Sequence, residues 1–341
     1  MDMDSSSQVN QESGHMKYSF IGDTTYSLLL YLLYASEDML GHTTYYVGNN
    51  LSPLALPNKV VMPPMLSFDD KTRLLYRLRC LKYRWSLSRS EIYAQDHLFF
   101  SSPLIDNLPY TLLEDCPNFF TNFDYRQHLY NSGNHKERFF NFFTGRIGMH
   151  YRGYNPWCKK RILTTDRDKE FFDGLKTYNY EQVNIQRLWD EASEDKRNVI
   201  LSAYNLSKID LNALAFRNGV IFSQPLCLDA HFSFSEQRDL FLPYVEKYGA
   251  ENIVVKLHPR DDFDYKKAYP GVEILNTKAP QQLLSLMGLK FDIAITCCSS
   301  AVSSMNKDCQ IIWLGAEVDE RIVKAYGHVN NPFEPNKQSI L

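Results

Sequence analysis

The sequence lacks a hydrophobic run long enough to cross a membrane. Its longest apolar stretch, residues 26–35, is much shorter than the roughly 18 residues that a bilayer-spanning helix needs. No secretory signal is recognisable, so we expect a cytoplasmic protein. The chain also lacks the large positive net charge of a nonspecific nucleic-acid binder, since its formal net charge is −3. We therefore expect no nucleic-acid partner.

Motifs for metal ions and common cofactors are missing as well. The seven cysteines form no Cys-x-x-Cys pair, and no Cys/His cluster has zinc-ligand spacing, so we predict reduced thiols and no metal site. The sequence contains no Gly-x-Gly-x-x-Gly motif and no Walker-type loop. None of the predicted strands is followed by an Asp-x-Asp pair. These absences exclude the commonest nucleotide-binding loops, so a phosphate site would have to be built in another way.

The length and composition are those of a globular protein with two domains. Hydrophobic residues make up 44% of the 341 residues and charged residues 23%, which excludes a disordered chain, a collagen and a coiled coil. We expect a tag or disordered tail over residues 1–16, an N-terminal domain over 17–205 and a C-terminal domain over 206–341. The linker is expected within 186–218.

Strand and helix patterns alternate in both halves of the chain. The C-terminal half predicts strands over 219–223, 252–257, 272–275, 291–296 and 309–314, and helices over 233–248, 280–287, 297–305 and 317–326. The N-terminal half predicts strands over 17–21, 44–47, 59–62, 98–100 and 110–113, helices over 26–40 and 70–87, and an aromatic insertion from about 117 to 185. A further short strand is predicted at 199–201. This alternation is typical of an α/β fold with parallel, doubly wound sheets, which bind ligands at the carboxyl ends of their strands.

A histidine followed by a proline stands where the strand 252–257 ends, in the run Lys256-Leu-His258-Pro259-Arg260. Because proline stiffens the backbone, His258 would be held at the ligand edge of the sheet, where it can donate to a phosphate oxygen or protonate a leaving group. Lys256 adds positive charge beside it. An ordinary turn in a basic loop would contain the same residues.

Small hydroxyl residues follow the strand 291–296, in the run Thr296-Cys-Cys-Ser299-Ser300-Ala. Hydroxyl groups and free backbone N–H groups at the start of a helix form an anion site, although a simple helix cap uses the same residues. Since this motif and the His-Pro motif both end strands of one predicted sheet, we predict that they converge on a single phosphate.

Two carboxylates, Glu114 and Asp115, follow the strand 110–113 and precede a Cys116-Pro117 turn. Either carboxylate could act as a general base, and their proximity would raise the pKa of one of them. A solvated acidic turn would have the same sequence.

The segment 71–90 carries seven basic residues and no acidic residue, beside an apolar stripe at helical spacing. Such a helix can lie on an anionic membrane surface, and an ordinary domain helix with a basic solvent-exposed face is the alternative. The basic residues are Lys71, Arg73, Arg77, Arg79, Lys82, Arg84 and Arg89, and the apolar ones are Leu74, Leu75, Leu78, Leu81 and Trp85.

Taken in order, Leu-Leu-Glu114-Asp115-Cys, Val-Val-Lys256-Leu-His258-Pro259-Arg and Thr-Cys-Cys-Ser299-Ser300-Ala resemble a known set of motifs. These are the acidic, His-Pro and Ser motifs of bacterial sialyltransferases of the GT-B type, and the match is to the lipooligosaccharide and capsule sialyltransferases and their polysialyltransferase relatives. The run Ile-Phe-Ser-Gln224-Pro-Leu is similar to the stretch that opens their donor-binding domain. In layout the resemblance covers residues 17–341.

The resemblance implies two Rossmann-like domains facing a cleft, with the donor CMP-sialic acid bound mainly to the second. By position, Glu114 or Asp115 would be the base, Glu114 being our first choice, and His258 would bind the phosphate and assist its departure. The implied donor-binding residues also include Lys256, Pro259, Ser299, Ser300 and Gln224, with no metal or other cofactor. The family usually has glycine where Cys116 stands, and cysteine adopts a positive φ less freely.

We therefore expect an inverting, metal-independent sialyltransferase that extends a bacterial surface glycan: lipooligosaccharide, O-antigen or capsule. Its acceptor would be lipid-linked, and the enzyme would work from the inner face of the plasma membrane as a peripheral protein. Two alternatives remain open from the residues. One is a GT-B transferase that uses another donor, such as a CMP-Kdo-type sugar or a nucleotide-linked hexose, and the other is a non-catalytic module that binds a glycan or a nucleotide.

Overall fold

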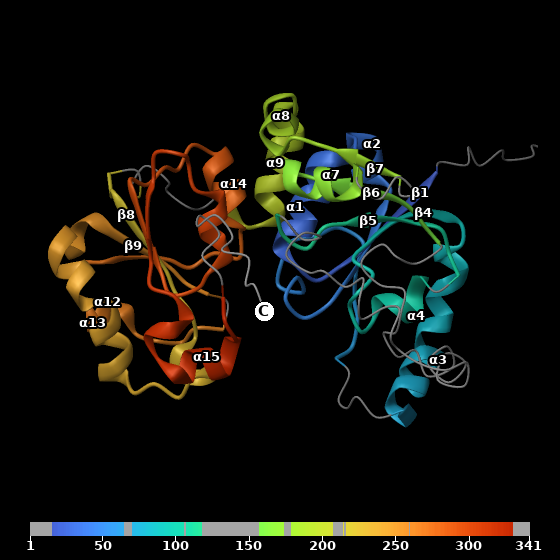
Figure 1. Cartoon of the computed structure of the whole chain (residues 1–341). Coiled ribbons are helices and arrows are strands. Elements are labelled where there is room, and N and C mark those ends of the chain that lie inside the picture. Colours follow the sequence, from blue (N-terminus) through green and yellow to red (C-terminus); the bar gives the residue numbers. More distant parts are fainter. Residues whose placement is uncertain are drawn as a thin grey trace, which may run out of the picture. The chain divides into compact units, whose positions relative to one another are not determined.

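The computed structural model describes residues 16–64, 70–105, 107–117, 157–173, 179–206, 214, 216–258 and 260–329. The chain divides into two compact units, each of which has its own sheet (Figure 1). Unit 1 comprises residues 1–23, 34–52 and 56–183, and unit 2 comprises residues 24–33, 53–55 and 184–341. Most of the predicted tail and much of the predicted aromatic insertion lie outside the described residues.

Unit 1 is built on a seven-stranded sheet in the order β3-β2-β1-β4-β5-β6-β7, in which every neighbouring pair is parallel. The strands are β1 (Lys17–Gly22), β2 (Thr43–Val47), β3 (Lys59–Val61), β4 (Ser90–Ala94), β5 (Tyr110–Leu113), β6 (Cys158–Leu163) and β7 (Tyr180–Gln182). The helices are α2 (Glu37–Gly41), α3 (Asp70–Leu87), α4 (Ser101–Ile105) and α7 (Asp166–Asp173). In the core, Ile21 of β1 and Leu112 of β5 belong to the same apolar cluster as Tyr76 and Cys80 of α3.

Unit 2 contains a five-stranded parallel sheet in the order β10-β9-β8-β11-β12. Its strands are β8 (Gly219–Phe222), β9 (Ile253–Lys256), β10 (Glu273–Leu275), β11 (Ile293–Thr296) and β12 (Gln310–Trp313). The α-helices are α1 (Thr25–Tyr34), α8 (Ile185–Asp190), α9 (Glu194–Ala203), α11 (Leu226–Asp229), α12 (Phe234–Tyr248), α13 (Tyr265–Ala268), α14 (Gln281–Leu286) and α15 (Glu320–Tyr326). Short 3₁₀ turns are η2 (Ala250–Asn252), η3 (Ser300–Ser304) and η4 (Ala316–Val318).

The central strands of unit 2 are apolar up to their carboxyl ends because both faces of the sheet are covered. All four residues of β8 are buried. On one face, Ile221 of β8 and Val255 of β9 share a core cluster with Phe241 of α12 and Ile322 of α15. The parallel, doubly wound α/β architecture predicted from the sequence is confirmed in both units.

Local signals explain where individual elements differ from the prediction. The helix expected over 26–40 is two helices, because the Ser36 side chain caps α2 by accepting the Met39 N–H at 3.2 Å. The strand predicted at 199–201 is wrong: these residues lie in α9, which Ser193 caps and which has two acidic residues in its first turn. The strand predicted at 98–100 is also wrong, since these residues form a turn before α4.

The two units meet in sequence between Val183 and Asn184, whereas the sequence analysis put the boundary at 205/206. The reason is that α8 and α9 belong with α1. In that group, Lys196 Nζ donates to the Leu33 carbonyl at 2.7 Å, and the Tyr204 hydroxyl donates to the Thr25 carbonyl at 2.7 Å. Much of the segment expected to contain the linker is therefore helical, in α8 and α9.

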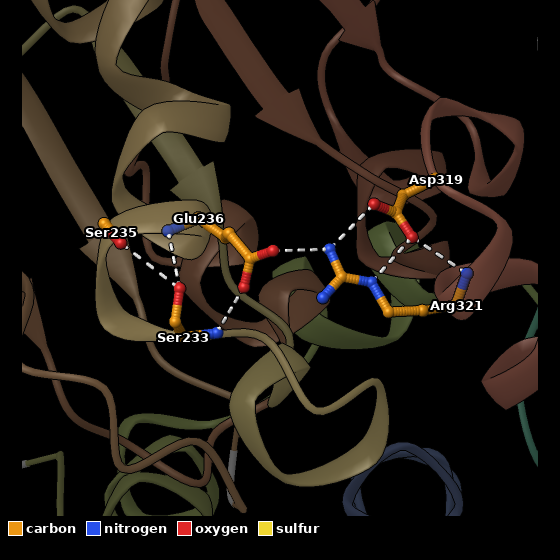
Figure 2. A network of polar contacts seen from close by, with 5 residues as sticks. All are labelled: Ser233, Ser235, Glu236, Asp319 and Arg321. Atoms are coloured by element: carbon orange, nitrogen blue, oxygen red, sulfur yellow. Dashed lines mark hydrogen bonds and ion pairs between the residues drawn. The ribbon is translucent and has the colours of Figure 1, made fainter.

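A polar network joins the starts of α12 and α15 (Figure 2). Ser233 and Glu236 form a capping box, in which Ser233 Oγ accepts the Glu236 N–H and Glu236 Oε2 accepts the Ser233 N–H. Arg321 of α15 donates to Glu236 Oε1 at 3.0 Å and to Asp319, which caps α15. The hydrogen bonds from Arg321 and Ser233 lower the pKa of Glu236 to about 2.

We expect Ser233→Ala to lower the free energy of unfolding by about 1 kcal/mol, because it removes the N-cap acceptor of α12. Equilibrium unfolding in urea measures this change. Ser235→Ala is the matched control, since the Ser235 hydroxyl contacts only the Ser233 hydroxyl among the contacts of Figure 2. Equal unfolding midpoints for Ser233→Ala and Ser235→Ala would contradict a stabilising cap.

Candidate active site

The donor-side candidates lie at the carboxyl edge of the unit 2 sheet. The strand order reverses at β8, which has β9 and β10 on one side and β11 and β12 on the other. Such a switch point is where open α/β sheets bind ligands. Ser223 and Gln224 directly follow β8, His258 follows β9, and Ser299 follows β11, so the parallel register brings the three strand ends to the same edge.

His258 is held by backbone and side-chain contacts on both sides. Its own N–H donates to Ser223 Oγ at 2.9 Å, and its ring Nδ1 accepts the Arg260 N–H at 3.2 Å. A neutral ring that accepts at Nδ1 carries its proton on Nε2, so the Nε2–H is the donor available to a ligand. Burial, with the positive charge of Arg260, lowers the pKa of His258 and favours this neutral form at neutral pH.

The two cations beside His258 differ in what they can do. Burial lowers the pKa of Lys256, the last residue of β9, to about 8, so its ammonium is still mostly charged at neutral pH. Arg260 instead binds both carboxylate oxygens of Asp229, at 2.9 and 2.6 Å, and Tyr326 donates to the same carboxylate. Lys256 therefore supplies the positive charge at this edge, while Arg260 anchors the loop.

A buried polar network, missed in the sequence analysis, fixes the loop after His258. Asp261 accepts the Phe263 N–H at 3.2 Å and the Tyr265 hydroxyl at 3.0 Å, and it also bonds Ser223. The Tyr265 hydroxyl in turn accepts from the fully buried Gln237 at 3.0 Å. Burial raises the pKa of Asp261. The sequence signal for this network was Asp261 itself, three residues after His258.

The Ser motif is tied to β8 by two side chains. Thr296 Oγ1 donates to the Phe222 carbonyl at 3.2 Å and accepts the Ser299 N–H at 3.1 Å. Cys298 Sγ donates to Gln224 Oε1 at 2.8 Å. The segment after Ser299 is the 3₁₀ turn η3 and not the predicted α-helix. Pro259 and the side chain of Ser300 lie outside the described residues.

Two consecutive residues after β8 link the His-Pro motif to the Ser motif, and these are the two motifs predicted to converge on a single phosphate. Ser223 contacts the His258 loop, and Gln224 contacts the Ser motif. Together, an imidazole N–H, an ammonium and hydroxyl groups stand on neighbouring strand ends of one unit. This is a chemistry suited to a phosphate group.

The acidic motif lies at the corresponding edge of unit 1, after β5. Glu114 is fully buried, whereas 29% of the Asp115 side chain is exposed. Asp115 Oδ1 accepts from Gln95 Nε2 at 2.5 Å, and Asp115 Oδ2 lies 3.8 Å from His97 Nε2. Cys116, where the family usually has glycine, packs against the apolar core and is not among the described residues with positive φ. The turn after the two acids therefore does not require glycine here.

Gln95 and His97 are site residues that the sequence analysis missed. They follow β4, a short strand with only three buried residues that was not predicted. Without that strand, the residues after it could not be recognised as strand-end positions. Across the described parts of the chain, no group of three or more His, Cys, Asp or Glu side chains could hold a metal ion.

Comparison with known proteins agrees with this geometry. A model of Glycosyltransferase family 52 matches residues 93–313, which include all three motifs. An uncharacterized protein of Haemophilus influenzae is 24% identical over 320 residues, covering 92% of this chain and 99% of that protein.

Two solved structures from Photobacterium resemble the whole fold. The GT-B domain of a sialyltransferase from Photobacterium damselae matches at 12% identity with a TM-score of 0.55, covering 90% of this chain and 96% of that one. An alpha/beta-galactoside alpha-2,3-sialyltransferase from Photobacterium phosphoreum matches at 10% identity with a TM-score of 0.53, covering 91% and 95%. These likenesses confirm the GT-B fold and the expected resemblance to bacterial sialyltransferases. Since the family model spans well over half of the sequence, the chain belongs to glycosyltransferase family 52.

Proposed function

We propose that this glycosyltransferase moves sialic acid from CMP-sialic acid to a hydroxyl group of a bacterial surface glycan, with inversion at the anomeric carbon. The observation that carries the proposal is the grouping of the His258 Nε2–H, the Lys256 ammonium and the Ser motif on adjacent strand ends. The sialyltransferases that share the fold support the choice of sugar.

In the proposed reaction, the acceptor oxygen attacks the anomeric carbon of the donor while the bond from that carbon to the phosphate oxygen breaks. Negative charge develops on the departing CMP phosphate. The His258 Nε2–H, Lys256 and Ser299 would stabilise this charge, so the reaction needs no metal ion. A carboxylate of unit 1 would accept the proton of the attacking hydroxyl.

Exposure favours Asp115 as that base over Glu114, which was our first choice from the motif. A general base must come within hydrogen-bond reach of the acceptor hydroxyl, and Glu114 has no exposed surface. Asp115 combines partial exposure with a fixed orientation, because Gln95 holds its other oxygen.

We expect His258→Ala to weaken CMP binding about 10- to 100-fold, the loss of a charge-assisted hydrogen bond. Isothermal calorimetry with CMP, in excess chelator, measures this affinity. His42→Ala is the control, since His42 lies in unit 1 and pairs with Asp38 on its surface. Unchanged CMP affinity in a folded His258→Ala variant would remove His258 from the donor site. Tighter binding of UDP than of CMP would indicate another donor.

Asp115→Asn keeps the shape of the side chain but removes the basic oxygen, so turnover should fall about 10²- to 10⁴-fold while CMP affinity holds. The assay is transfer from CMP-sialic acid to a galactose-terminated acceptor, in excess chelator. Glu114→Gln is the matched comparison and should cost less turnover than Asp115→Asn. The reverse order would restore Glu114 as the base, and full activity in both variants would exclude the acidic motif from catalysis.

We also propose that α3 docks the enzyme on an anionic membrane where a lipid-linked acceptor resides. Four leucines of this helix, Leu74, Leu75, Leu78 and Leu81, are 45–55% exposed, and Trp85 is 67% exposed. Arg79, Lys82 and Arg89 are exposed on the same segment, with Arg89 stacked 3.7 Å over the Trp85 ring. Among the described helices, none has the length and hydrophobicity to cross a bilayer.

The protein should sediment with anionic phospholipid vesicles at low salt and be released at about 0.5 M salt, where charge attraction is screened within a few ångströms. The triple variant Arg79→Gln/Lys82→Gln/Arg89→Gln should lose this binding. Arg84 is kept because its guanidinium donates to the carbonyls of Pro103 and Leu104.

The matched control, Lys247→Gln/Lys266→Gln/Lys324→Gln, removes the same charge from exposed sites of unit 2 and should bind like the wild type. Equal binding to neutral vesicles, or equal loss in both triple variants, would contradict docking through α3.

A further inference from the structure

A single buried amide connects three neighbouring strand ends in unit 1. Gln95, the residue after β4, is fully buried. Its Oε1 accepts the backbone N–H of Asp23, the residue after β1, at 2.8 Å. Its Nε2 donates to Oδ1 of Asp115, after β5, at 2.5 Å. The side chain therefore spans β1, β4 and β5 in the sheet order and touches the carboxylate that we assign as the base.

Contacts with the neighbouring backbone fix both the position of the Gln95 side chain and the orientation of its amide. The Gln95 N–H donates to the Ile21 carbonyl at 2.9 Å, which holds the start of the side chain at the β1 edge. At Gly22 a Cβ would lie 3.0 Å from Gln95 Oε1 and 2.5 Å from the Phe20 ring, so the glycine leaves the space that the amide occupies. Because Oε1 faces an N–H donor, the NH₂ group of Gln95 must face Asp115.

Asp23, on the other side of the amide, is held in its turn. Its Oδ1 accepts the N–H groups of Asn50 and Leu51, at 3.0 and 3.2 Å. At Gly48 a Cβ would lie 2.5 Å from this carboxylate, so a side chain there would displace Asp23. The contacts that run from the loop after β2 through Asp23 and Gln95 to Asp115 therefore allow few other arrangements of these side chains.

We propose that Gln95 is a positioning residue for the base: its NH₂ group holds one oxygen of Asp115 so that the other oxygen can accept the acceptor proton. The inference rests on the proposed function, since it assigns Gln95 a role in that reaction. Among the described residues, His97 Nε2 lies 3.8 Å from Asp115 Oδ2, and Asp23, Asp96 and Glu114 stand on the adjoining strand ends. The Asp96 carboxylate is occupied by the Tyr110 hydroxyl at 2.7 Å.

Two variants of nearly equal shape separate positioning from packing. Gln95→Met fills the space without a donor, and kcat should fall about tenfold while CMP affinity stays unchanged. Gln95→Glu places a second carboxyl group against Asp115. At pH 8 a negative charge on the introduced carboxyl group would repel the negative charge of the base, so this variant should be slower than Gln95→Met. Near pH 5.5 the pair can share a proton, which restores the donor, so Gln95→Glu should become the faster of the two.

Tyr110→Phe is the control, because it also removes a buried hydrogen bond to a carboxylate. That carboxylate belongs to Asp96, which follows β4 directly after Gln95. This substitution should lower stability without changing the pH dependence of kcat. A ratio of Gln95→Glu to Gln95→Met activity that does not change between pH 8 and 5.5, or a loss explained by weaker CMP binding, would overturn the proposal.

Urea unfolding of the same two variants tests the contact without any substrate. The free energy of unfolding of Gln95→Glu relative to Gln95→Met should rise from pH 8 to pH 5.5. This rise should be smaller in the Asp115→Asn background, where only the burial of the introduced carboxyl group remains. If sialic acid transfer is absent in the wild type but this coupling is present, the proposed function fails while the contact between residue 95 and Asp115 stands. If the coupling is absent, the positioning role fails whatever the reaction.

Discussion

The parallel alignment of β9, β8 and β11 is the constraint on which the candidate donor site of this glycosyltransferase depends. Parallel strands end at the same edge, so residues 35 and 74 positions apart in sequence come within one hydrogen bond of each other. The strands themselves are apolar and buried on both faces, which leaves their ends as the first places where polar groups can stand. Polar groups that are partly buried there need partners, and they find them on the neighbouring strand end.

This requirement explains why the candidate residues are held so firmly. Ser223 Oγ accepts the His258 N–H, and Ser223 also bonds Asp261. The Arg260 backbone N–H fixes the His258 tautomer, while the Arg260 side chain binds Asp229. The loop is thus held by hydrogen bonds to other residues of unit 2. The imidazole keeps one N–H for a ligand, and Lys256 keeps its charge because its pKa, lowered by burial to about 8, is still above neutral pH.

In unit 1 the strand-end residues also bond one another, but here the charged group is a carboxylate. The sheet of this unit also reverses order at a central strand, and the residues after β1, β4 and β5 bond one another. Here the partner of the Asp115 carboxylate is the neutral amide of Gln95, which fixes its direction without cancelling its charge. Glu114, one residue earlier, is fully buried. A one-residue difference therefore separates a partly exposed carboxylate from a fully buried one.

The sequence alone determined the α/β class, the parallel sheets, α3 to the residue, and the three motifs that led to the family. These follow from hydrophobic periodicity and from residue types at strand ends, which are local properties of the chain. It did not reveal that 194–203 is a helix joined to α1, because a short apolar run at 199–201 fits a strand or a buried helix equally well.

Only the tertiary structure decided which strand-end residues meet. Gln95, His97 and Ser223 have no signal of their own, since their importance comes from contacts to residues 18 to 35 positions away, on other strand ends. The same holds for the choice between Glu114 and Asp115, which are adjacent carboxylates in the sequence and differ only in burial. Exposure and hydrogen-bond partners are properties of the packed sheet, so no reading of residue types along the chain could supply them.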